Sequence, residues 1–235
     1  MRKISYSIVA PCFNESKNIP LILKKFKKAI GQRNDIELIL VDNGSVDDSW
    51  SVFKKHIPNF IFAKTTRIKK NIGYGHGILY GLQIAQGKFL GWTHADLQTD
   101  PADIIEAIKI IEKTSQAERL FIKGKRTKRP VIDKILSLGM GFFASFHLGS
   151  YLYEINAQPT IFSRTFFDAW NNPPHDFSLD LYAYYQAKKL RYKIIRIPVL
   201  FPNRKFGKSS WNDSWKSRAV MISRSIKYII NLKKE

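Results

Sequence analysis

Short apolar runs alternate with longer segments of helical periodicity through the first hundred residues. The runs are rich in β-branched and aromatic side chains, and they lie at 6–11, 36–41, 60–63 and 89–92. The segments between them carry apolar side chains three or four positions apart, or open with acids that suit a helix N-terminus. This alternation predicts an α/β fold, with an open, mostly parallel sheet flanked by helices.

The second half of the chain continues the alternation less regularly. We expect further strands at 120–124, 161–163 and 193–199, and helices after Pro101 and over 177–190. Pro at a first helical position, with Asp100 before it as the N-cap, supports the start of the first of these helices.

Residues 135–153 contain no Lys, Arg, Asp or Glu. A segment of this length could just span a bilayer. However, three glycines, three serines and one histidine make it more polar than lone spans usually are. We therefore expect a helix that packs against the sheet or lies in a membrane interface.

The C-terminal segment has apolar residues at helical spacing together with tryptophans and basic residues. The apolar positions are Trp211, Trp215, Ala219, Ile222, Ile226 and Ile229. Such a pattern is typical of a helix on a membrane surface, and equally of a terminal helix docked on its own domain. We expect a catalytic domain over 1–210, with a donor half at about 1–100 and an acceptor half at about 101–210, and a basic amphipathic helix over 211–235.

The chain carries a formal charge of +20, from 39 Lys and Arg against 19 Asp and Glu. Nucleic acid, an anionic membrane surface and phosphorylated substrates are the partners that fit such an excess. The sequence has no zinc-finger spacing, RNA-recognition motif or basic-zipper heptads, so we expect no nucleic-acid partner. Cys12 is the only cysteine and no secretory signal precedes the first strand, which favours the reducing cytoplasm.

The candidate chemistry begins where the run at 89–92 ends. His94, Asp96 and Gln98 follow it, and open α/β sheets bind ligands at the carboxyl ends of their strands. The Asp and Gln oxygens could hold a hard divalent cation, although a capped turn with a solvated Asp would look the same. The glycine-rich loop at 69–77 suggests a phosphate cradle, but it matches neither the Rossmann nor the Walker spacing.

Five motifs occur in order and together resemble a known family. They are Val-Ala-Pro-Cys-Phe-Asn-Glu at 9–15, Val-Asp-Asn-Gly-Ser-Val-Asp at 41–47, Asn-Ile-Gly-Tyr-Gly at 71–75, His-Ala-Asp-Leu-Gln at 94–98 and Arg-Lys-Phe-Gly-Lys-Ser at 204–209. The set is similar to the inverting nucleotide-sugar glycosyltransferases of family 2, which have the GT-A fold. Within them it most resembles the branch of dolichyl-phosphate mannose synthase and other polyprenyl-phosphate glycosyltransferases.

The resemblance implies a role for each motif. It assigns Asp96 and Gln98 to Mg²⁺ or Mn²⁺, which would clamp the diphosphate and neutralise charge on the departing nucleotide. The residues implied to bind the donor are Pro11, Asn14, Glu15, Asp42, Gly73, Gly75, His94 and Ala95. His94 departs from the family motif, which has Asp there, and an imidazole tolerates Mn²⁺ better than Mg²⁺.

The resemblance also implies an acceptor site in the basic half. Arg126, Arg204 and Lys208 match positions that grip an acceptor phosphate, for which the guanidinium fork is well suited. Asp176 and Asp180 are four residues apart, so on one helix they would face the same way. Either is the candidate base if the acceptor is a hydroxyl, whereas a phosphate is already anionic and needs none.

We therefore expect a metal-dependent enzyme that moves a sugar from a nucleotide-sugar to a polyprenyl (dolichyl or undecaprenyl) phosphate. It would sit peripherally on the cytoplasmic face of a membrane, because the membrane helices that follow the family's catalytic domain are absent from the sequence. One alternative is transfer to a saccharide hydroxyl of a surface glycan. The other is a non-catalytic membrane or nucleic-acid binding protein of the same fold.

Overall fold

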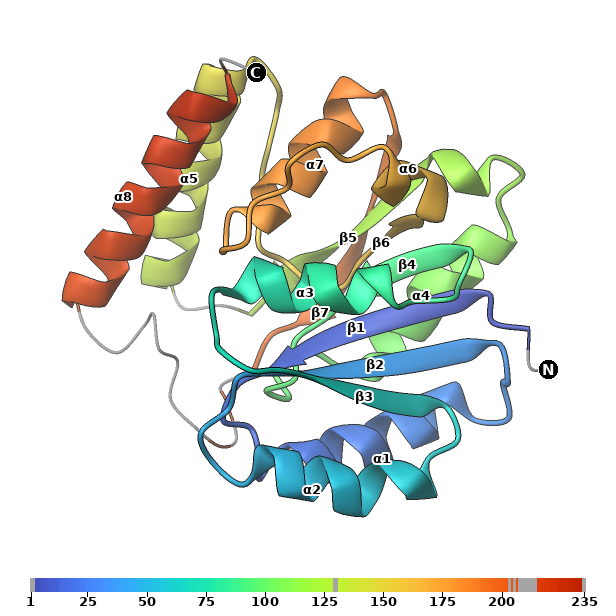
Figure 1. Cartoon of the computed structure of the whole chain (residues 1–235). Coiled ribbons are helices and arrows are strands. Elements are labelled where there is room, and N and C mark those ends of the chain that lie inside the picture. The colour runs from blue at the N-terminus through green and yellow to red at the C-terminus, as the bar shows by residue number, and fades with distance from the viewer. Residues whose placement is uncertain (1–2, 129–130, 203, 205, 207–214, 234–235) are drawn as a thin grey trace.

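A computed structural model of the chain describes residues 3–128, 131–202, 204, 206 and 215–233. They contain a seven-stranded sheet with the order β3-β2-β1-β4-β6-β5-β7 (Figure 1). The strands are β1 (Tyr6–Cys12), β2 (Ile36–Asn43), β3 (Ala63–Ile68), β4 (Phe89–Trp92), β5 (Leu120–Thr127), β6 (Thr160–Ser163) and β7 (Lys193–Leu200). Every neighbouring pair is parallel except the two that involve β6, so the mixed α/β architecture with a mostly parallel sheet is confirmed.

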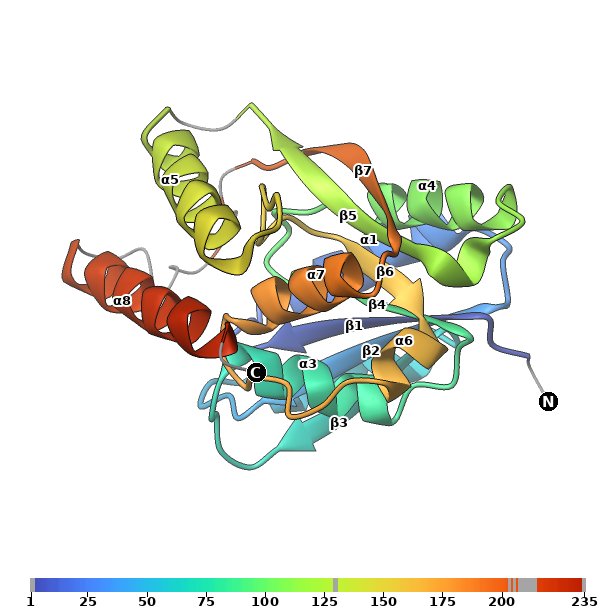
Figure 2. The ribbon, with the colours of Figure 1, turned by 90° about the horizontal axis from the view of Figure 1, so that it is seen from above.

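Helices cover both faces of the sheet (Figures 1 and 2). The α-helices are α1 (Ile19–Ile30), α2 (Ser49–His56), α3 (Tyr74–Gln83), α4 (Pro101–Glu112), α5 (Val131–Leu148), α6 (Arg164–Asp168), α7 (Leu179–Lys189) and α8 (Trp215–Leu232). Single 3-10 turns lie at Ile57–Asn59 and Ala117–Arg119. One core forms where α1, α2 and α4 meet the sheet, and a second lies on the opposite face beneath α3, α6 and α7.

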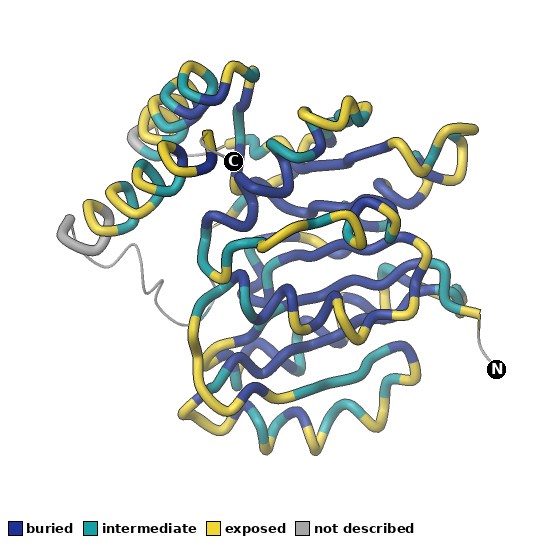
Figure 3. Tube along the Cα trace, turned by 45° about the horizontal axis from the view of Figure 1, so that its top comes forward, coloured by how far each residue is buried: buried dark blue, intermediate teal, exposed yellow. Residues whose placement is uncertain are grey.

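The burial pattern of the central strands follows from this layering. Both faces of β1 and β2 are covered, so successive side chains enter opposite cores: Ile8 packs into the first and Val9 into the second. Figure 3 shows these strands as a continuous dark-blue centre. The expectation that Asp100 caps the helix at Pro101 is confirmed, because its carboxylate accepts a hydrogen bond of 2.9 Å from the Ala102 N–H.

The third strand was placed wrongly by the sequence pattern. Of the run at 60–63, residues 60–62 precede the strand in a turn, and the rings of Phe60 and Phe62 meet edge to face with centroids 5.7 Å apart and pack onto the first core. The strand itself is the more polar β3, which pairs only with β2 at the edge of the sheet. Exposure on an edge permits polar side chains, and this removed the apolar signal.

The helix α3 begins earlier than expected, at Tyr74 rather than Ile78, and so includes part of the glycine-rich segment. Its glycines permit close packing of the helix. A Cβ at Gly81 would lie 2.4 Å from a methyl group of Val9, and one at Gly75 would lie 2.6 Å from the carbonyl oxygen of Asp176. The spacing that resembled a flexible loop therefore belongs to a helix pressed against its neighbours.

The helices α5 and α8 lie side by side at one end of the molecule (Figures 1 and 2). α5 replaces the helix expected at 135–153, and it starts four residues earlier and ends five earlier. The C-terminal helix is present from Trp215, while Trp211 lies outside the described residues. None of the described helices combines the length and apolar character needed to cross a membrane.

Candidate active site

Six strands end at one edge of the sheet, and the segments after them bring the candidate residues together. Because β1, β2, β3, β4, β5 and β7 run in the same direction while β6 opposes them, the carboxyl ends of these six strands share that edge. The segments that follow these strands supply Glu15, Asp96 and Arg204, and Asp42 lies near the end of β2. The positions expected to bind a ligand are thus neighbours in space, although they are up to 189 residues apart in sequence.

Arg204 links three acidic or amide side chains at the centre of this edge. Its Nη2 lies 2.8 Å from Oδ2 of Asp96, and its Nε donates to Oε1 of Gln98 at 3.3 Å. Its Nη1 lies 3.7 Å from Oε1 of Glu15. Asp96 is only 4% exposed, so the guanidinium neutralises a carboxylate that is largely removed from water.

The loop after β4 fixes the positions of the Asp96 and Gln98 side chains. Leu97 has φ of +65°, and the Gln98 N–H returns to Oδ1 of Asp96 at 3.0 Å. The Gln98 amide donates to the carbonyl of Pro202 at 2.9 Å, which ties the loop to the segment after β7. The metal-motif residues and the late basic loop are therefore held as one unit.

The donor set around Asp96 fits a divalent cation that shares its coordination with a bound diphosphate. Within the described ranges, no three His, Cys, Asp or Glu side chains gather into a metal cage. Mg²⁺ commonly needs only one or two carboxylates when phosphate oxygens supply the rest. The Asp96 carboxylate and Oε1 of the Gln98 side chain offer such a partial set of ligands. The position of Arg204 shows that positive charge is stabilised there.

Glu15 is buried beside this cluster. Burial raises the pKa of its carboxyl to about 7, although a hydrogen bond from the Asn18 amide and the charge of Arg204 oppose the shift. The group therefore changes protonation near neutral pH.

The loops after β1 and β2 are joined by backbone-to-side-chain hydrogen bonds. Asn14 accepts from the Val46 N–H at 2.9 Å, and its own N–H donates to the Ser45 hydroxyl at 3.0 Å. Asp42 is fully buried, accepts from the Ser45 N–H, and forms an ion pair of 3.1 Å with Arg67. These bonds fix the two loops against each other beside Pro11, and so pre-shape the site.

The glycines of the third motif touch the segment that precedes α7. A Cβ at Gly73 would fall 2.2 Å from the carbonyl oxygen of His175, and the His76 N–H donates to that same oxygen at 2.8 Å. The chain at 174–176 therefore lies directly on the N-terminal turn of α3. This contact carries Asp176 to the edge of the site.

A buried polar cluster joins β5, β6 and α7. Nζ of Lys123 lies 2.9 Å from Oδ1 of Asp180, and the same oxygen accepts from the Gln158 amide at 2.7 Å. Lys123 also donates to the Thr160 hydroxyl at 2.9 Å. Both charged side chains are almost fully buried, and burial lowers the pKa of Lys123 to about 8.

Aromatic side chains form a layer near this cluster. Tyr74 stacks on Phe177 with ring centroids 4.7 Å apart, and His94 lies 6.1 Å from Tyr74 and 6.2 Å from Phe201. Burial lowers the pKa of His94, and the guanidinium groups nearby lower it further, against the carboxylates of Asp96 and Asp180. The position that carries Asp in the family motif is thus a neutral imidazole at pH 7.

The acceptor candidates are only partly brought together. Arg126 bonds Glu154 through its Nε at 2.7 Å and covers the Phe201 ring at 5.5 Å, so it is anchored near the aromatic layer. Lys208 lies outside the described residues.

The expectation that Asp176 and Asp180 share a helix face is wrong, because α7 begins at Leu179. Asp176 instead accepts a hydrogen bond from the Ser178 N–H at 2.9 Å, just before the helix.

Lys123 was missed by sequence reasoning, which placed it in the strand expected at 120–124 but gave it no role in the site. Its position inside an apolar strand was the available signal, because a lysine in a buried strand needs a buried partner. Tyr74, Gln158 and Thr160 gave no comparable signal.

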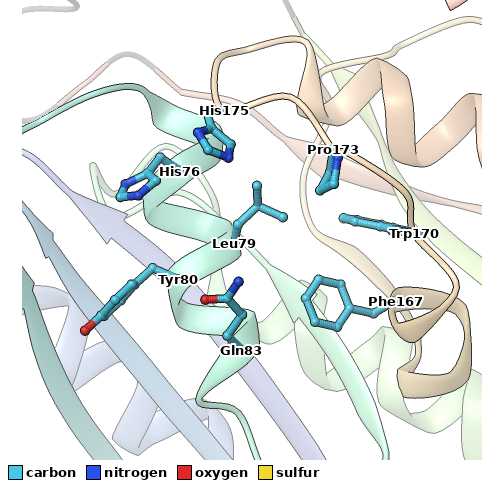
Figure 4. Close-up of a pocket in the computed structure, with 8 residues that line it drawn as sticks. All are labelled: His76, Leu79, Tyr80, Gln83, Phe167, Trp170, Pro173 and His175. Carbon is cyan, nitrogen blue, oxygen red and sulfur yellow. The ribbon is translucent and has the colours of Figure 1, made fainter.

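A separate pocket of about 330 Å³ lies on the outer side of α3 (Figure 4). Its lining comes from His76, Leu79, Tyr80, Gln83, Phe167, Trp170, Pro173 and His175. In the close-up, the rings of His76 and His175 lie near one another, with centroids 5.2 Å apart. The Asp96 cluster takes no part in this lining.

The model of "Glycosyl transferase family 2" matches residues 7–169, more than half of the chain. The chain belongs to glycosyl transferase family 2. The fold places the motifs within residues 7–169 at or near the carboxyl edge of the sheet, as described above.

Two curated relatives match about half of this family 2 chain. The glycosyltransferase YkcC of Bacillus subtilis is 33% identical over 129 residues, which are 54% of this chain and 39% of that protein. The dodecaprenyl-phosphate galacturonate synthase of Rhizobium johnstonii is 28% identical over 115 residues, 48% of this chain and 34% of that one. The matches thus span well under half of each relative.

A solved structure shares the fold over nearly the whole chain. Glucosyl-3-phosphoglycerate synthase from Mycobacterium tuberculosis, in complex with Mn²⁺, UDP and glucosyl-3-phosphoglycerate, superposes with a TM-score of 0.73 at 14% identity. The alignment covers 98% of this family 2 chain and 80% of that one, which identifies the GT-A fold.

Proposed function

We propose that this protein is an inverting glycosyltransferase that moves a sugar from a nucleotide-sugar to a polyprenyl phosphate at a membrane surface. One observation carries the proposal: in a family 2 domain, Asp96, Gln98 and Arg204 meet at the carboxyl edge of the sheet. This is where an open α/β sheet binds a ligand, and the groups suit a diphosphate with its cation.

The donor would lie across the loops after β1, β2 and β4. The proposed contacts to the base and ribose are Pro11, Asn14, Glu15 and Asp42, and those to the diphosphate side are Gly73, Gly75, His94 and Ala95. Asp96 and Gln98 would hold Mg²⁺ or Mn²⁺, which neutralises charge on the departing nucleoside diphosphate when it is bound. The neutral imidazole of His94 favours Mn²⁺ of the two.

For this reaction the protein must orient the donor diphosphate and the acceptor phosphate and must exclude water. An oxygen of the acceptor attacks the anomeric carbon from the face opposite the nucleotide, and the bond from that carbon to the diphosphate breaks. Arg126, Arg204 and, beyond the described residues, Lys208 are the proposed partners of the acceptor phosphate. Arg204 would leave Asp96 to do this once a cation replaces its charge there.

The buried cluster around Asp180 supports a phosphate acceptor. Oδ1 of Asp180 already receives hydrogen bonds from Lys123 and Gln158. A carboxylate engaged in this way is a weak candidate for removing a proton from a hydroxyl, and an acceptor phosphate needs no base. The dodecaprenyl-phosphate acceptor in the name of the Rhizobium relative is consistent with this choice.

Transfer to a saccharide hydroxyl is the second candidate function, and Asp176 is the residue that tests it. Its carboxylate lies before α7 and is partly exposed, so it could reach a hydroxyl. Asp176→Asn should abolish transfer if the acceptor is a hydroxyl, and should leave most of the activity if it is a phosphate. Asp180→Asn is less informative because it also leaves Lys123 without its counter-charge.

The first experiment is thermal stabilisation by UDP, GDP, CDP and dTDP, each with Mn²⁺, Mg²⁺ or EDTA. A ligand that binds the folded state raises Tm by mass action. We expect one nucleotide to raise Tm only with the metal present, and Asp96→Asn to remove that shift. If no nucleotide raises Tm under any condition, the enzyme proposal fails and a binding protein of this fold is favoured.

A further inference from the structure

The outer face of α5 is an exposed stripe of large apolar side chains. Val131, Ile135, Leu138, Phe142 and Phe146 are spaced 4, 3, 4 and 4 residues apart, which places them along one side of the helix. Phe142 and Phe146 are 76% and 79% exposed, so most of each ring is in contact with water. The stripe from Val131 to Phe146 is roughly 22 Å long at a rise of about 1.5 Å per residue.

This exposure is a property of one face only. The opposite side of α5 is buried: Ala144 and Leu148 belong to the second core, and Gly141 approaches the Leu152 carbonyl. α8 packs along a third side (Figure 2). α5 is therefore anchored to the molecule while a row of large apolar side chains faces water, and continuous apolar patches on soluble proteins mark interaction surfaces.

The charges that frame the stripe are predominantly basic. Lys125 and Lys128 are exposed at the end of β5, and Lys134 is exposed in the first turn of α5. The sequence of the neighbouring helix α8 contains four Lys or Arg and no Asp or Glu, and of these Arg224 and Lys227 are described as exposed. Two acids lie nearby: Asp133 is in the first turn of α5, and Glu154 is ion-paired with Arg126.

We infer that this face of α5 docks on an anionic lipid bilayer, with the phenylalanines in the acyl boundary and the lysines at the headgroups. An apolar helix face rimmed by basic residues is the pattern of helices that lie in the membrane interface. A second copy of the chain is the less favourable occupant, since each copy carries a net charge of +20.

The position of the stripe agrees with the acceptor chemistry, and in this respect the inference rests on the proposed function. α5 follows directly from β5, and β5 carries Arg126 at the site. A bilayer seated on α5 would bring lipid headgroups to the acceptor half. A polyprenyl phosphate could then reach Arg126 while its chain stays in the membrane.

Vesicle flotation tests the docking without any catalysis. The full chain is mixed with vesicles of phosphatidylcholine, alone or with phosphatidylglycerol, at low and high salt. We expect binding to the anionic vesicles that weakens at high salt. The double variant F142Q/F146Q should reduce the partition coefficient by at least about tenfold, because two aromatic side chains no longer enter the acyl boundary.

A matched control changes two exposed isoleucines elsewhere. I61Q/I84Q alters side chains that are 94% and 39% exposed near the opposite end of the strands, and it should bind vesicles as the wild type does. Thermal melts of both variants check that each is folded. The inference is overturned if the wild type does not bind anionic vesicles, or if F142Q/F146Q binds them as well as the wild type does. It is also overturned if the wild type is a dimer in solution and F142Q/F146Q is a monomer, because the stripe would then be a contact between two copies of the chain.

Transfer assays separate this inference from the proposed function. With a short, water-soluble polyprenyl phosphate, F142Q/F146Q should keep the wild-type rate, and with a long-chain acceptor in vesicles it should lose most of it. Transfer in solution without vesicle binding would overturn the docking and leave the function intact. Vesicle binding without transfer to any phosphate would overturn the function and leave the docking intact.

Discussion

At the scale of single residues, the site is organised by buried charges that compensate one another. Lys123 and Asp180 neutralise each other between β5 and α7, and Arg204 neutralises Asp96 at the carboxyl edge of the sheet. Burying either carboxylate alone would cost several kcal/mol, so each pair must be kept whole in the resting protein. The two pairs differ in one respect: the first is enclosed, whereas the side chain of Arg204 is 25% exposed and open to a ligand.

Breaking the enclosed pair should destabilise the fold. Lys123→Met leaves Asp180 with the Gln158 amide but without its ammonium partner, and we expect a loss of about 3–5 kcal/mol in the free energy of unfolding. The double variant K123M/D180L should recover most of this, because an apolar pair replaces the ionic one. Urea unfolding measures both. A loss under about 1 kcal/mol for the single variant would contradict this account.

Removing Arg204 should strengthen metal binding while weakening transfer. In Arg204→Ala the Asp96 carboxylate has no guanidinium at 2.8 Å, so a cation no longer has to displace a positive charge. We expect Mn²⁺ to bind several-fold more tightly in titration calorimetry with UDP present. Arg33→Ala, which breaks ion pairs with Asp35 and Glu112, is the control and should leave the affinity unchanged. Weaker Mn²⁺ binding in Arg204→Ala would show that the arginine does not compete with the metal.

Glu15 should make the stability of the ligand-free protein fall as pH rises. In the folded state burial holds its pKa at about 7, against 4.5 for the free side chain, so between these values the folded state binds more protons. Stability must then decrease through that window, by about 1–3 kcal/mol at roughly 1.4 kcal/mol per unit. Glu15→Gln should lose less stability than wild type between pH 5 and 8 in chemical unfolding. Equal losses in the two proteins would exclude Glu15 as the cause.

At the scale of helices and strands, the sequence pattern predicted what depends on local periodicity. The buried strands β1, β2 and β4 and the capped start of α4 lie where the pattern placed them, because each has an unbroken apolar run or a local cap. β3 and α3 were misplaced, because an edge strand tolerates polar residues and a closely packed helix needs glycine.

Within the candidate site, sequence motifs found the groups on loops but missed the buried cluster. Asp96, Gln98 and Arg204 occur in recognisable motifs and do come together. The partnership of Lys123 with Asp180 joins residues 57 positions apart, and no local rule links them. Only the pairing of β5 with β6 and the packing of α7 onto the sheet create it.

Gly75 tests the contact between α3 and the segment before α7. In Gly75→Ala the new Cβ would lie 2.6–2.7 Å from two carbonyl oxygens, so Asp176 and its neighbours must move. We expect a loss of about 1–3 kcal/mol in stability and weaker donor binding. Gly139→Ala is the control on α5, where a Cβ meets no atom within 4 Å, and it should stabilise by about 0.5–1 kcal/mol. A neutral Gly75→Ala would show that this contact is loose.

At the scale of the whole molecule, stability is unevenly distributed. The sheet is covered on both faces, whereas α8 is attached mainly through α5. Among the α8 side chains that are described, Ile229 and Leu232 are the buried ones, and Arg224 and Lys227 are exposed. A helix with so little buried apolar surface should unfold locally while the rest of the protein stays folded.

Amide hydrogen exchange should measure this difference in stability between α8 and the central sheet, and should show whether membrane docking changes it. We expect amides of α8 to exchange much faster than those of β1 and β2, because few buried contacts hold the helix closed. Anionic vesicles should slow exchange in α5 and α8, since docking the α5 stripe limits the separation of the two helices. Phosphatidylcholine vesicles provide the comparison, and exchange in β2 should stay constant throughout. Exchange in α8 as slow as in β2 without vesicles would mean that the helix pair is an integral part of the core, and docking would then have to occur on a rigid surface.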